Sequence, residues 1–462
     1  MNQKNRFIKA VILWSVVAIL FTVTAASLLA YAYGYRYDLT NRTIFKSGLL
    51  AVTTEPKNTL LVFEDKNKSI PTTIRGLASG SYHFTIEKSG YRPWLGQAVI
   101  VPGLATEMKD IQLVASTNTQ TKIFDEPLVN FWPDTNRAVV ELSRWDKNKV
   151  QLLDFETGLA RPLFADLPIV YTVKNALFSP DDNFVLISAY YQGGLKRFIV
   201  DLTQETHQIL PSAYTSLPFE DFVWHPYTKG RLFVKRPDKT VEIIDLGEEL
   251  LIRPYLETTP SFTVNRNNAL FLRQAENGLE LVEKNLYDES EKILTTAIPQ
   301  ANYYRLLTAD GHLLLLTAVD NRFLDFVVYP WHQNGKAAFA ELGHAQEVVV
   351  QDKQIVWRSG RAIHRYDLVK EIDRLLYENA STTPRLLKVS PTVIYVSEGN
   401  KLKMFDIWGL NPYELSQSKI DTNIYVDKNQ ESLFFLLGNY LTQFSLKESG
   451  GMGFLGNIVP WN

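Results

Sequence analysis

The sequence contains no cysteine in its 462 residues. This absence excludes disulfide bonds, thiolate nucleophiles, cysteine-ligated zinc and iron–sulfur clusters. It also excludes a lipoprotein, because lipid attachment at a mature N-terminus needs a cysteine. Exported bacterial domains ordinarily fold without disulfides, whereas secreted eukaryotic proteins of this size usually contain some. The absence therefore favours a bacterial cell envelope.

An excess of charge of one sign is also missing. The chain has 48 Lys and Arg against 50 Asp and Glu, which gives a formal net charge of −2. Proteins that bind the phosphates of nucleic acids normally carry a basic stripe, and none is visible here. We therefore expect no nucleic-acid partner.

Motifs that carry catalysis or metal binding are missing as well. The seven histidines never occur as H-x-H or H-E-x-x-H, and the sequence has no G-x-S-x-G nucleophile elbow. Gly451, Gly453 and Gly456 fit G-x-G-x-x-G, but no helix can follow so close to the C-terminus. We therefore predict no catalytic residue, metal or cofactor, and we interpret residues 449–462 as a C-terminal tail.

One long apolar run is present, at residues 10–33, and it contains no charged residue. About 20 such residues cross a ~30 Å hydrocarbon layer as a helix. This length favours a retained transmembrane helix over a cleaved signal peptide, the alternative that Ala30-Tyr31-Ala32 leaves open. Residues 1–9 would form a cytoplasmic tail because they carry Lys4, Arg6 and Lys9. The bulk would then lie outside the plasma (inner) membrane, beyond a juxtamembrane linker at residues 34–47.

Residues 48–114 show short alternating runs separated by turn residues, a pattern typical of a small β-sandwich. The segments Leu77-Ala78-Ser79-Gly80-Ser81-Tyr82 and Glu87-Lys88-Ser89-Gly90-Tyr91 resemble steps of the PEGA-domain family. Gly48-Leu49, Pro56 and Pro71 also match that family. The resemblance implies an extracytoplasmic module without catalytic residues.

From residue 121 to residue 448 the chain repeats a unit in which a polar turn precedes a strongly apolar strand. Eight such turns occur at intervals of roughly 36–47 residues, the length of a four-stranded propeller blade. They are Trp132-Pro133-Asp134, Ser179-Pro180-Asp181, His225-Pro226-Tyr227, Asn265-Arg266-Asn267, Ala309-Asp310-Gly311, Gln351-Asp352-Lys353, Ser390-Pro391-Thr392 and Asp427-Lys428-Asn429. The pattern predicts a seven- or eight-bladed β-propeller, with seven blades if one unit is an extension.

A second marker follows most of these turns, where a later strand ends in aspartate. The five examples are Asp154, Asp201, Asp245, Asp367 and Asp406. Together, the two markers resemble the repeats of TolB-type and WD-repeat propellers. The predicted fold class is therefore all-β, with a transmembrane helix, a PEGA-like sandwich and a propeller.

Turns between the second and third strands of propeller blades commonly form a binding face. Cationic and aromatic side chains there can pair with anions and stack on planar groups. The candidate residues are Arg144, Trp145, Tyr190, Tyr191, Arg236, Arg322, Arg358 and Arg361. We therefore expect a membrane-anchored binding or scaffolding protein whose partner is an envelope protein or glycan. A propeller-type hydrolase or quinoprotein enzyme is the alternative.

Overall fold

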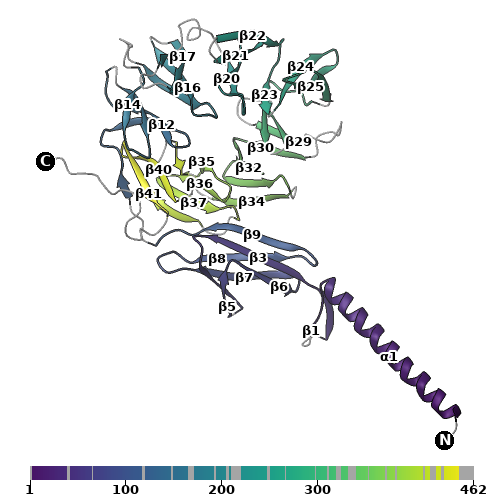
Figure 1. The fold of residues 1–462 in the computed structure, drawn as a ribbon. Helices are drawn as coiled ribbons and strands as arrows, with labels where there is room; N and C mark the ends of the chain where they lie inside the picture. Colours follow the sequence, from purple (N-terminus) through teal and green to yellow (C-terminus); the bar gives the residue numbers. More distant parts are fainter. Residues whose placement is uncertain are drawn as a thin grey trace. The chain divides into compact units, whose positions relative to one another are not determined.

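The computed structural model describes residues 3–446 except 39–41, 65, 117–119, 147–148, 165–170, 192–193, 204–207, 210–219, 247–249, 266, 297, 310–311, 319–323, 331–339, 352, 370–371, 380–381, 409–411, 417–422 and 428–430. The regular elements of this part of the chain are one α-helix and β-strands, which turns and loops connect (Figure 1). The prediction of an all-β protein with an apolar N-terminal helix is confirmed. The chain divides into unit 1, which is Met1–Asn118 with the segment from Leu446 onward, and unit 2, Thr119–Ser445. The tail predicted at residues 449–462 lies outside the described residues.

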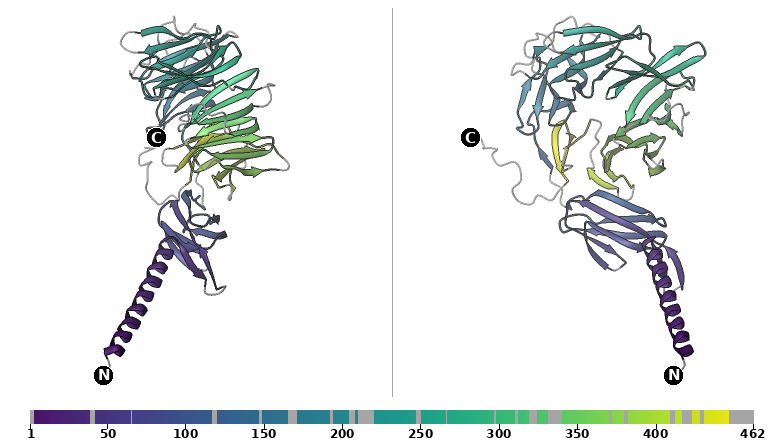
Figure 2. Two further views of the ribbon diagram at one scale, coloured as in Figure 1. Left: turned by 90° about the vertical axis from the view of Figure 1, so that its right-hand side faces the viewer. Right: turned by 45° about the vertical axis from the view of Figure 1, so that its right-hand side comes forward.

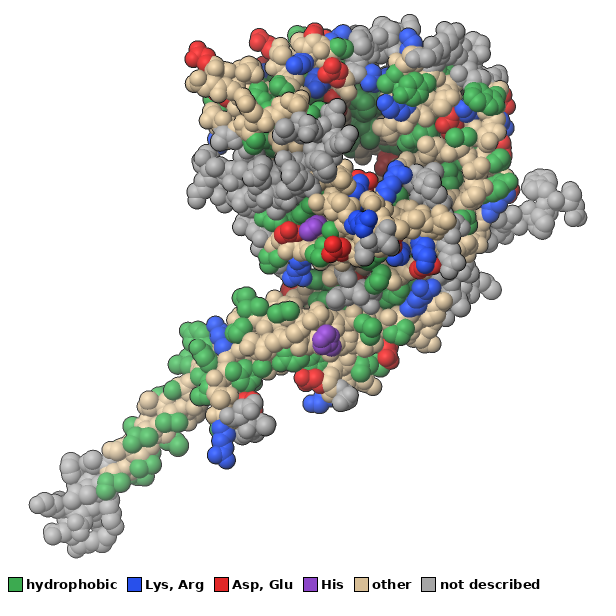
Figure 3. Space-filling model, turned by 180° about the vertical axis from the view of Figure 1, so that it is seen from behind, with side chains coloured by type: hydrophobic (Ala, Val, Ile, Leu, Met, Phe, Trp, Pro, Cys, Tyr) green, Lys and Arg blue, Asp and Glu red, His purple; other side chains and the backbone are tan. Residues whose placement is uncertain are grey.

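Helix α1 spans Gln3–Ala32. Its segment Ile12–Ala32 has a mean hydropathy of 2.3 over 21 residues, and none of it is buried in the protein. At 1.5 Å per residue this segment is roughly 32 Å long, which matches the thickness of a bilayer's hydrocarbon core. The helix stops because Gly34 adopts a φ of +87°, a conformation that favours glycine. Figure 3 shows hydrophobic side chains along the described part of this helix.

The strands of unit 1 form a hairpin and two sheets. The hairpin pairs β1 (Tyr35–Asp38) with β2 (Thr43–Lys46). A three-stranded sheet has the order β6 (Thr72–Leu77), β3 (Gly48–Glu55), β9 (Ala105–Gln112), and its β3–β9 pair is parallel. A four-stranded antiparallel sheet has the order β5 (Lys66–Ile70), β4 (Thr59–Phe63), β7 (Gly80–Glu87), β8 (Trp94–Ile100).

Both larger sheets of unit 1 bury every second side chain. Buried and more exposed residues alternate along the whole of β3 and β8, as expected of strands with one covered face. Trp94 is fully buried, and its ring centroid lies 5.7 Å from that of Phe84. A Cβ at Gly96 would come within 2.5 Å of the Phe84 ring. Glycine is therefore required at this position of β8.

Unit 2 contains seven four-stranded antiparallel sheets that are each made of four strands following one another in the chain. The first three sheets are β11 (Leu128–Pro133), β12 (Arg137–Leu142), β13 (Val150–Asp154) and β14 (Ala160–Pro162); β15 (Thr172–Phe178), β16 (Phe184–Tyr191), β17 (Gly194–Asp201) and β18 (Gln208–Ile209); and β19 (Asp221–Trp224), β20 (Arg231–Lys235), β21 (Val241–Leu246) and β22 (Leu250–Leu256). The fourth and fifth are β23 (Phe262–Asn265), β24 (Asn268–Ala275), β25 (Gly278–Asn285) and β26 (Glu291–Thr295); and β27 (Tyr303–Ala309), β28 (His312–Ala318), β29 (Leu324–Pro330) and β30 (Ala340–Ala345). The sixth and seventh are β31 (Glu347–Gln351), β32 (Gln354–Ser359), β33 (Ala362–Asp367) and β34 (Ile372–Glu378); and β35 (Arg385–Val389), β36 (Val393–Glu398), β37 (Lys401–Asp406) and β38 (Tyr413–Ser416).

The eighth sheet joins the two ends of unit 2. Its order is β10 (Gln120–Lys122), β41 (Tyr440–Ser445), β40 (Ser432–Leu437), β39 (Tyr425–Val426). The strand that precedes the first sheet is thus the fourth strand of the last sheet. Of the eight turns identified in the sequence, the described residues lie at the end of the first strand of a sheet or between its first and second strands.

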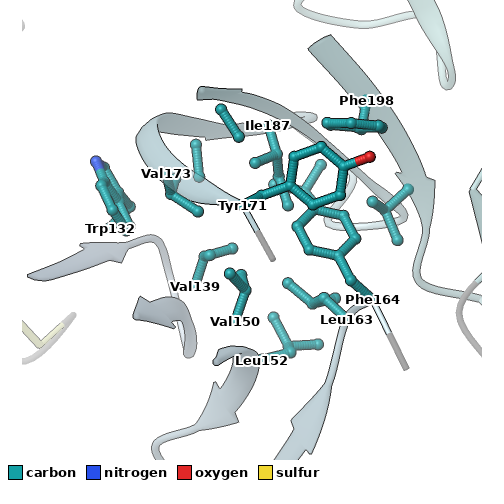
Figure 4. Packing of buried hydrophobic residues seen from close by; sticks show 14 of the residues in the cluster. Trp132, Val139, Val150, Leu152, Leu163, Phe164, Tyr171, Val173, Ile187 and Phe198 are labelled. Carbon is teal, nitrogen blue, oxygen red and sulfur yellow. The ribbon is translucent and has the colours of Figure 1, made fainter. Parts of the chain in front are cut away.

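Hydrophobic clusters join consecutive sheets of unit 2. One cluster lies between the first and second sheets and includes Trp132, Val139, Phe164 and Phe198 (Figure 4). Five further clusters each join two consecutive sheets, from the pair formed by the second and third sheets to the pair formed by the sixth and seventh. Another cluster joins the eighth sheet to the first through residues such as Leu441. Figure 2 shows the sheets of unit 2 following one another around the unit.

The turn after the first strand is stabilised by its leading residue. The Oγ of Ser179 accepts a hydrogen bond from the backbone N–H of Phe184 at 3.0 Å, and Ser390 Oγ accepts one from Val393 at 3.1 Å. In the third sheet the buried His225 takes this place. Its Nδ1 accepts hydrogen bonds from the backbone N–H groups of the residues two and three positions later, at 3.1 and 2.7 Å. The serine and histidine side chains therefore perform one role, which is to accept backbone hydrogen bonds within the turn.

The aspartate at the end of the third strand also stabilises a turn. Four of the five markers accept a hydrogen bond from the backbone N–H two residues later, between 2.8 and 3.1 Å; they are Asp154, Asp201, Asp367 and Asp406. The fifth, Asp245, instead forms a two-point ion pair with Arg231, at 2.5 and 3.2 Å. The repeated aspartate is thus explained by turn geometry and needs no catalytic role.

In the fourth sheet, an asparagine takes the place of the aspartate at the end of the third strand. Asn285 ends β25 opposite Asn268, and Asp245 lies one residue before the end of β21 opposite Arg231. Its Oδ1 accepts hydrogen bonds from the backbone N–H groups of Tyr287 at 2.8 Å and Asp288 at 3.3 Å. A search for aspartate alone misses this unit, because the amide oxygen accepts the same hydrogen bonds as a carboxylate.

Candidate binding surface

The connections between second and third strands lie at one end of each sheet in unit 2. We call this set of connections the 2–3 edge, and its described parts include residues 143–146, 236–240, 276–277, 360–361, 399–400 and 438–439. Antiparallel strands reverse at every turn, so the 1–2 and 3–4 connections lie at the opposite end of each sheet. We call that end the 1–2 edge.

Arg144 and Trp145 lie at the 2–3 edge of the first sheet. Arg144 forms ion pairs with Glu126 at 3.0 Å and Asp146 at 3.3 Å. Trp145 is 82% exposed, and the Nζ of Lys149 lies 4.4 Å from the centroid of its ring. An exposed indole held by a cation presents one wide aromatic surface for stacking.

Lys149 connects this aromatic surface to the buried part of the sheet. Its Nζ lies 2.7 Å from a carboxylate oxygen of Glu141, and both side chains are almost completely buried. It also donates a hydrogen bond to Thr172 Oγ1 on the second sheet, at 3.4 Å. Removing one member of a buried ion pair is strongly destabilising, so this pair has a structural role.

Two further candidate arginines are engaged in ion pairs with carboxylates. Arg236 lies 2.7 Å from Glu242, and both side chains are three-quarters or more buried. Arg358 lies 3.2 Å from Glu347 and also donates hydrogen bonds to the side chain of Gln346 and the backbone oxygen of Gly360. Their charges are therefore largely balanced within the protein.

The remaining candidate residues differ in how exposed their side chains are. Tyr190 is 44% exposed, and the Nζ of Lys174 lies 5.9 Å from its ring centroid. Arg361 is exposed, and its backbone oxygen accepts a hydrogen bond from the backbone N–H of Asn379 at 3.3 Å. Tyr191 ends β16, but its side chain lies outside the described residues, as does the whole of Arg322. The exposed candidates are thus Trp145, Tyr190 and Arg361.

A polar network at the 2–3 edge, centred on the buried Glu398, was not found from the sequence. Glu398 accepts hydrogen bonds from Lys403, Tyr377 and Asn379. Although burial raises its pKa, these hydrogen bonds outweigh burial and lower it below the usual glutamate range. Its members come from the sixth and seventh sheets, and no spacing in the sequence indicates that they meet.

Carboxyl groups from neighbouring sheets meet at the 1–2 edge. Burial, together with a hydrogen bond and charge repulsion from Asp182, raises the pKa of Asp134 to about 6, while Lys388 acts in the opposite direction. Tyr425 of the eighth sheet donates a hydrogen bond to the backbone oxygen of Thr135. Burial raises the pKa of Tyr425 to about 12, and the nearby aspartates add to this. Asp134 belongs to a turn identified in the sequence and Asp182 directly follows another, and no local pattern indicates that the two meet.

Unit 1 has a shallow depression of about 870 Å³ of its own. It is lined by side chains of β4, β5 and the segment after β7, including Ser69, Lys88 and Tyr91. The Nζ of Lys88 donates a hydrogen bond to the backbone oxygen of Lys57 at 2.6 Å. Among the described residues, no group of three or more His, Cys, Asp or Glu side chains is placed to hold a metal ion.

Comparison with known proteins gives no family for this chain. No family model matches the sequence, and no curated protein matches it. Among solved structures, the chain can be matched to the crystal structure of an uncharacterised protein of Listeria monocytogenes EGD-e, with 11% sequence identity and a TM-score of 0.41. The similarity covers 65% of this chain and 97% of the other. At this level it supports no conclusion about fold or function.

Proposed function

We propose that the chain is a single-pass membrane protein whose unit 2 is an eight-bladed β-propeller that binds an envelope protein or glycan outside the cytoplasm. The observation that carries the proposal is the eighth sheet, in which β10 pairs with β41. Propellers close their ring when strands from both ends of the chain share one blade. The hydrophobic cluster between the eighth and first sheets agrees with such closure.

The strand arrangement supports the propeller in a second way. Each of the first seven sheets has four consecutive antiparallel strands, and hydrophobic clusters join each of the first six sheets to the next. Propellers are built from four-stranded sheets repeated around a centre, so that every sheet packs against two neighbours. We assign the eight sheets to eight blades.

For unit 1 we propose a small β-sandwich of PEGA type. Its three- and four-stranded sheets both show alternating burial, which fits two sheets that face each other. The chain passes from β6 in one sheet to β7 in the other through the segment Leu77–Tyr82, which resembles the family's glycine step. Gly80 in this segment has a φ of +154°. The second glycine step supplies Gly90, with a φ of +81°, followed by the buried Tyr91.

For the membrane helix we propose retention, with the N-terminus in the cytoplasm. The length and exposure of α1 support a membrane span. The cations Lys4, Arg6 and Lys9 before it support the orientation, since basic flanks stay in the cytoplasm. A reporter enzyme that is active only outside the cytoplasm, fused after Asn462, should be active. Activity of a cytoplasm-specific reporter at the same place would contradict this orientation.

Within the propeller we propose that the 2–3 edge binds the partner through Trp145, Tyr190 and Arg361. Aromatic residues and arginine are the side chains most enriched at the energetic centres of interfaces. The ion pairs of Arg144, Arg236 and Arg358 leave these arginines less charge for an outside ligand. Binding through this edge should therefore depend more on stacking than on net positive charge.

The test is co-purification from cross-linked, detergent-solubilised envelopes of cells that produce the full chain. The triple variant Trp145→Ala, Tyr190→Ala, Arg361→Ala should lose most of the partner that the natural protein retains. Tyr227 and Tyr287, which are 67% and 73% exposed, lie in a 1–2 and a 3–4 connection and provide a matched control. Their double alanine variant should retain the partner. Equal retention by both variants would remove the 2–3 edge from the proposal and direct the search to unit 1.

A further inference from the structure

We propose that unit 1 carries a lipid-binding surface, formed by hairpin β1–β2 and the turn between β8 and β9, which lies in the headgroup layer beside helix α1. This surface, which we call the headgroup surface, consists of Tyr35, Tyr37, Ile44, Lys46, Val101 and Leu104. The inference rests on the membrane anchoring proposed above. It adds a second contact with the bilayer besides the helix itself.

Hydrogen bonds fix the hairpin to the end of the helix. The backbone N–H and the Oγ of Ser47 both donate to the backbone oxygen of Gly34, at 2.8 and 2.7 Å. Arg36 donates to the backbone oxygen of Tyr31 at 2.9 Å, and its guanidinium carbon lies 3.7 Å from the centroid of the Tyr31 ring. Figures 1 and 2 show the hairpin beside the C-terminal end of α1. The hairpin therefore cannot move far from the place where the helix leaves the bilayer.

One face of this hairpin combines tyrosines, an aliphatic side chain and a cation. Tyr35 lies opposite Lys46 in the pairing, and Tyr37 lies opposite Ile44. Directly opposite residues in an antiparallel pair share a face, so these four side chains lie on the same side. Tyr35, Tyr37 and Ile44 are 44%, 57% and 71% exposed. In the described part of the protein, these three side chains therefore remain exposed.

The turn between β8 and β9 continues the surface. The backbone N–H of Gly103 donates to the backbone oxygen of Ser47 at 3.0 Å. Gly103 has a φ of +76°, and a Cβ there would come within 2.5 Å of the Lys46 side chain. Lys46 therefore lies over this turn. The two apolar residues of the turn, Val101 and Leu104, are 44% and 60% exposed.

The chemistry of these side chains fits a lipid headgroup layer. The apolar segment of α1 ends at Ala32, so the residues attached there lie where hydrocarbon gives way to headgroups. Tyrosine prefers this layer, and a lysine can place its apolar stem in it while its charge remains among phosphates. Arg36, Arg42 and Lys46 outnumber the single acid Asp38 in the hairpin region. Basic residues near a membrane surface are attracted to anionic lipids.

The cysteine-free sequence allows a direct test with single-cysteine variants of the full chain. Spin labels at Ile44→Cys and Leu104→Cys report on the proposed surface, and a label at Val23→Cys reports on the helix. Leu95→Cys is the control, because Leu95 has nearly the same exposed fraction as Leu104 (62% against 60%) but lies at the other end of β8. Val101 is six positions later in the chain, which corresponds to about 20 Å along a strand. The labelled proteins are placed in vesicles of phosphatidylcholine with or without phosphatidylglycerol.

The measurement is the collision rate of each label with oxygen, which enters lipid, and with a water-soluble nickel chelate. We expect the nickel collision rates at Ile44 and Leu104 to be several-fold lower than at Leu95, with the larger reduction in phosphatidylglycerol. If all three positions collide equally with nickel while Val23 remains protected, the headgroup surface is wrong and the membrane anchor stands. If Val23 is also open to nickel, the anchoring itself fails. Protection of Ile44 and Leu104 in both lipids supports insertion of the apolar side chains.

Discussion

Gln120 lies opposite Phe444 in an antiparallel strand pair, so the first strand of unit 2 completes the sheet that contains its last. Thr121 and Gln443 form the next pair, and the backbone N–H of Ile123 donates to the backbone oxygen of Leu441 at 3.0 Å. This pairing holds together two segments that are separated by nearly all of unit 2. The strand that β10 contributes to this sheet is only three residues long.

A disulfide across this pair should stabilise the protein. In the variant Thr121→Cys, Gln443→Cys the two side chains project from paired positions, and no other thiol competes for them. Closing so long a loop should raise the free energy of unfolding by up to about 5 kcal/mol in the chain-entropy account. Thermal unfolding with and without reductant measures the gain. Failure of the disulfide to form under mild oxidation would contradict the pairing of β10 with β41.

The turn led by His225 in the third sheet should make the stability of the protein sensitive to acid. Burial lowers the pKa of His225 to about 4, and the charge of Arg231 acts in the same direction. The unfolded chain therefore binds this proton more tightly, and stability is lost as pH falls from about 6.5 towards 4. His225→Asn keeps an acceptor for the turn and removes the titration. Denaturant unfolding at pH 7 and pH 4.5 should show a smaller loss for this variant, by on the order of 2 kcal/mol.

The variant His225→Ala separates the two roles of this side chain. It leaves the backbone N–H groups of Tyr227 and Thr228 without their acceptor. The alanine variant should therefore be less stable than the asparagine variant at pH 7, by about 1–3 kcal/mol. Equal stability of the two at that pH would show that the hydrogen bonds to Nδ1 contribute nothing.

The carboxyl pair of Asp134 and Asp182 at the 1–2 edge should affect stability in the opposite direction, by lowering it as pH rises. The raised pKa of Asp134 means that the folded state binds its proton more tightly than the unfolded state. Its contribution is therefore present at pH 4 and is lost as pH rises through about 6. Asp134→Asn should raise the free energy of unfolding at pH 7 by about 1 kcal/mol, a figure reduced for solvent screening of this partly exposed group. The gain should disappear at pH 4, and Asp182→Asn should act in the same direction because it removes the repelling charge.

The strand-end aspartate of the second sheet should be replaceable only by another oxygen acceptor. Asp201 accepts hydrogen bonds from the backbone N–H and the Oγ1 of Thr203, at 2.8 and 2.7 Å. Asp201→Ala should cost about 1–2 kcal/mol of stability, whereas Asp201→Asn should cost less, because Asn285 performs this role in the fourth sheet. Chemical unfolding of the two variants decides between them. Equal losses would show that the carboxylate charge matters more than the acceptor geometry.

Local patterns predicted much of the fold because each depends on neighbouring residues. The uncharged run at residues 10–33 ends within one residue of helix α1. The short alternating runs noted in residues 48–114 include strand β4, Thr59–Phe63. The turns led by Ser179, His225 and Ser390 contain their own hydrogen-bond partners, so the sequence alone could locate them.

Contacts between residues that are far apart in the sequence could not be predicted from local patterns. Nothing in Gln120–Lys122 has the apolar alternation of a strand, and it forms one because β41 offers it an open edge. Residues 34–47 were expected as a linker and contain a hairpin that hydrogen bonds fix to the helix. The candidate arginines of the 2–3 edge were identified from their turns. Their carboxylate partners, such as Glu242 and Glu347, lie on other strands.

One apolar helix, a β-rich remainder and a repeated turn-and-strand unit could therefore be predicted from the sequence alone. Hydrophobic periodicity, turn residues and charge are properties of short segments, and short segments keep them in the folded state. The folded structure was needed to establish which arginines form ion pairs, which carboxyl groups meet and which aromatic side chains remain exposed. Those outcomes depend on distances between strands far apart in the chain, where burial and neighbouring charges set the energy of each side chain.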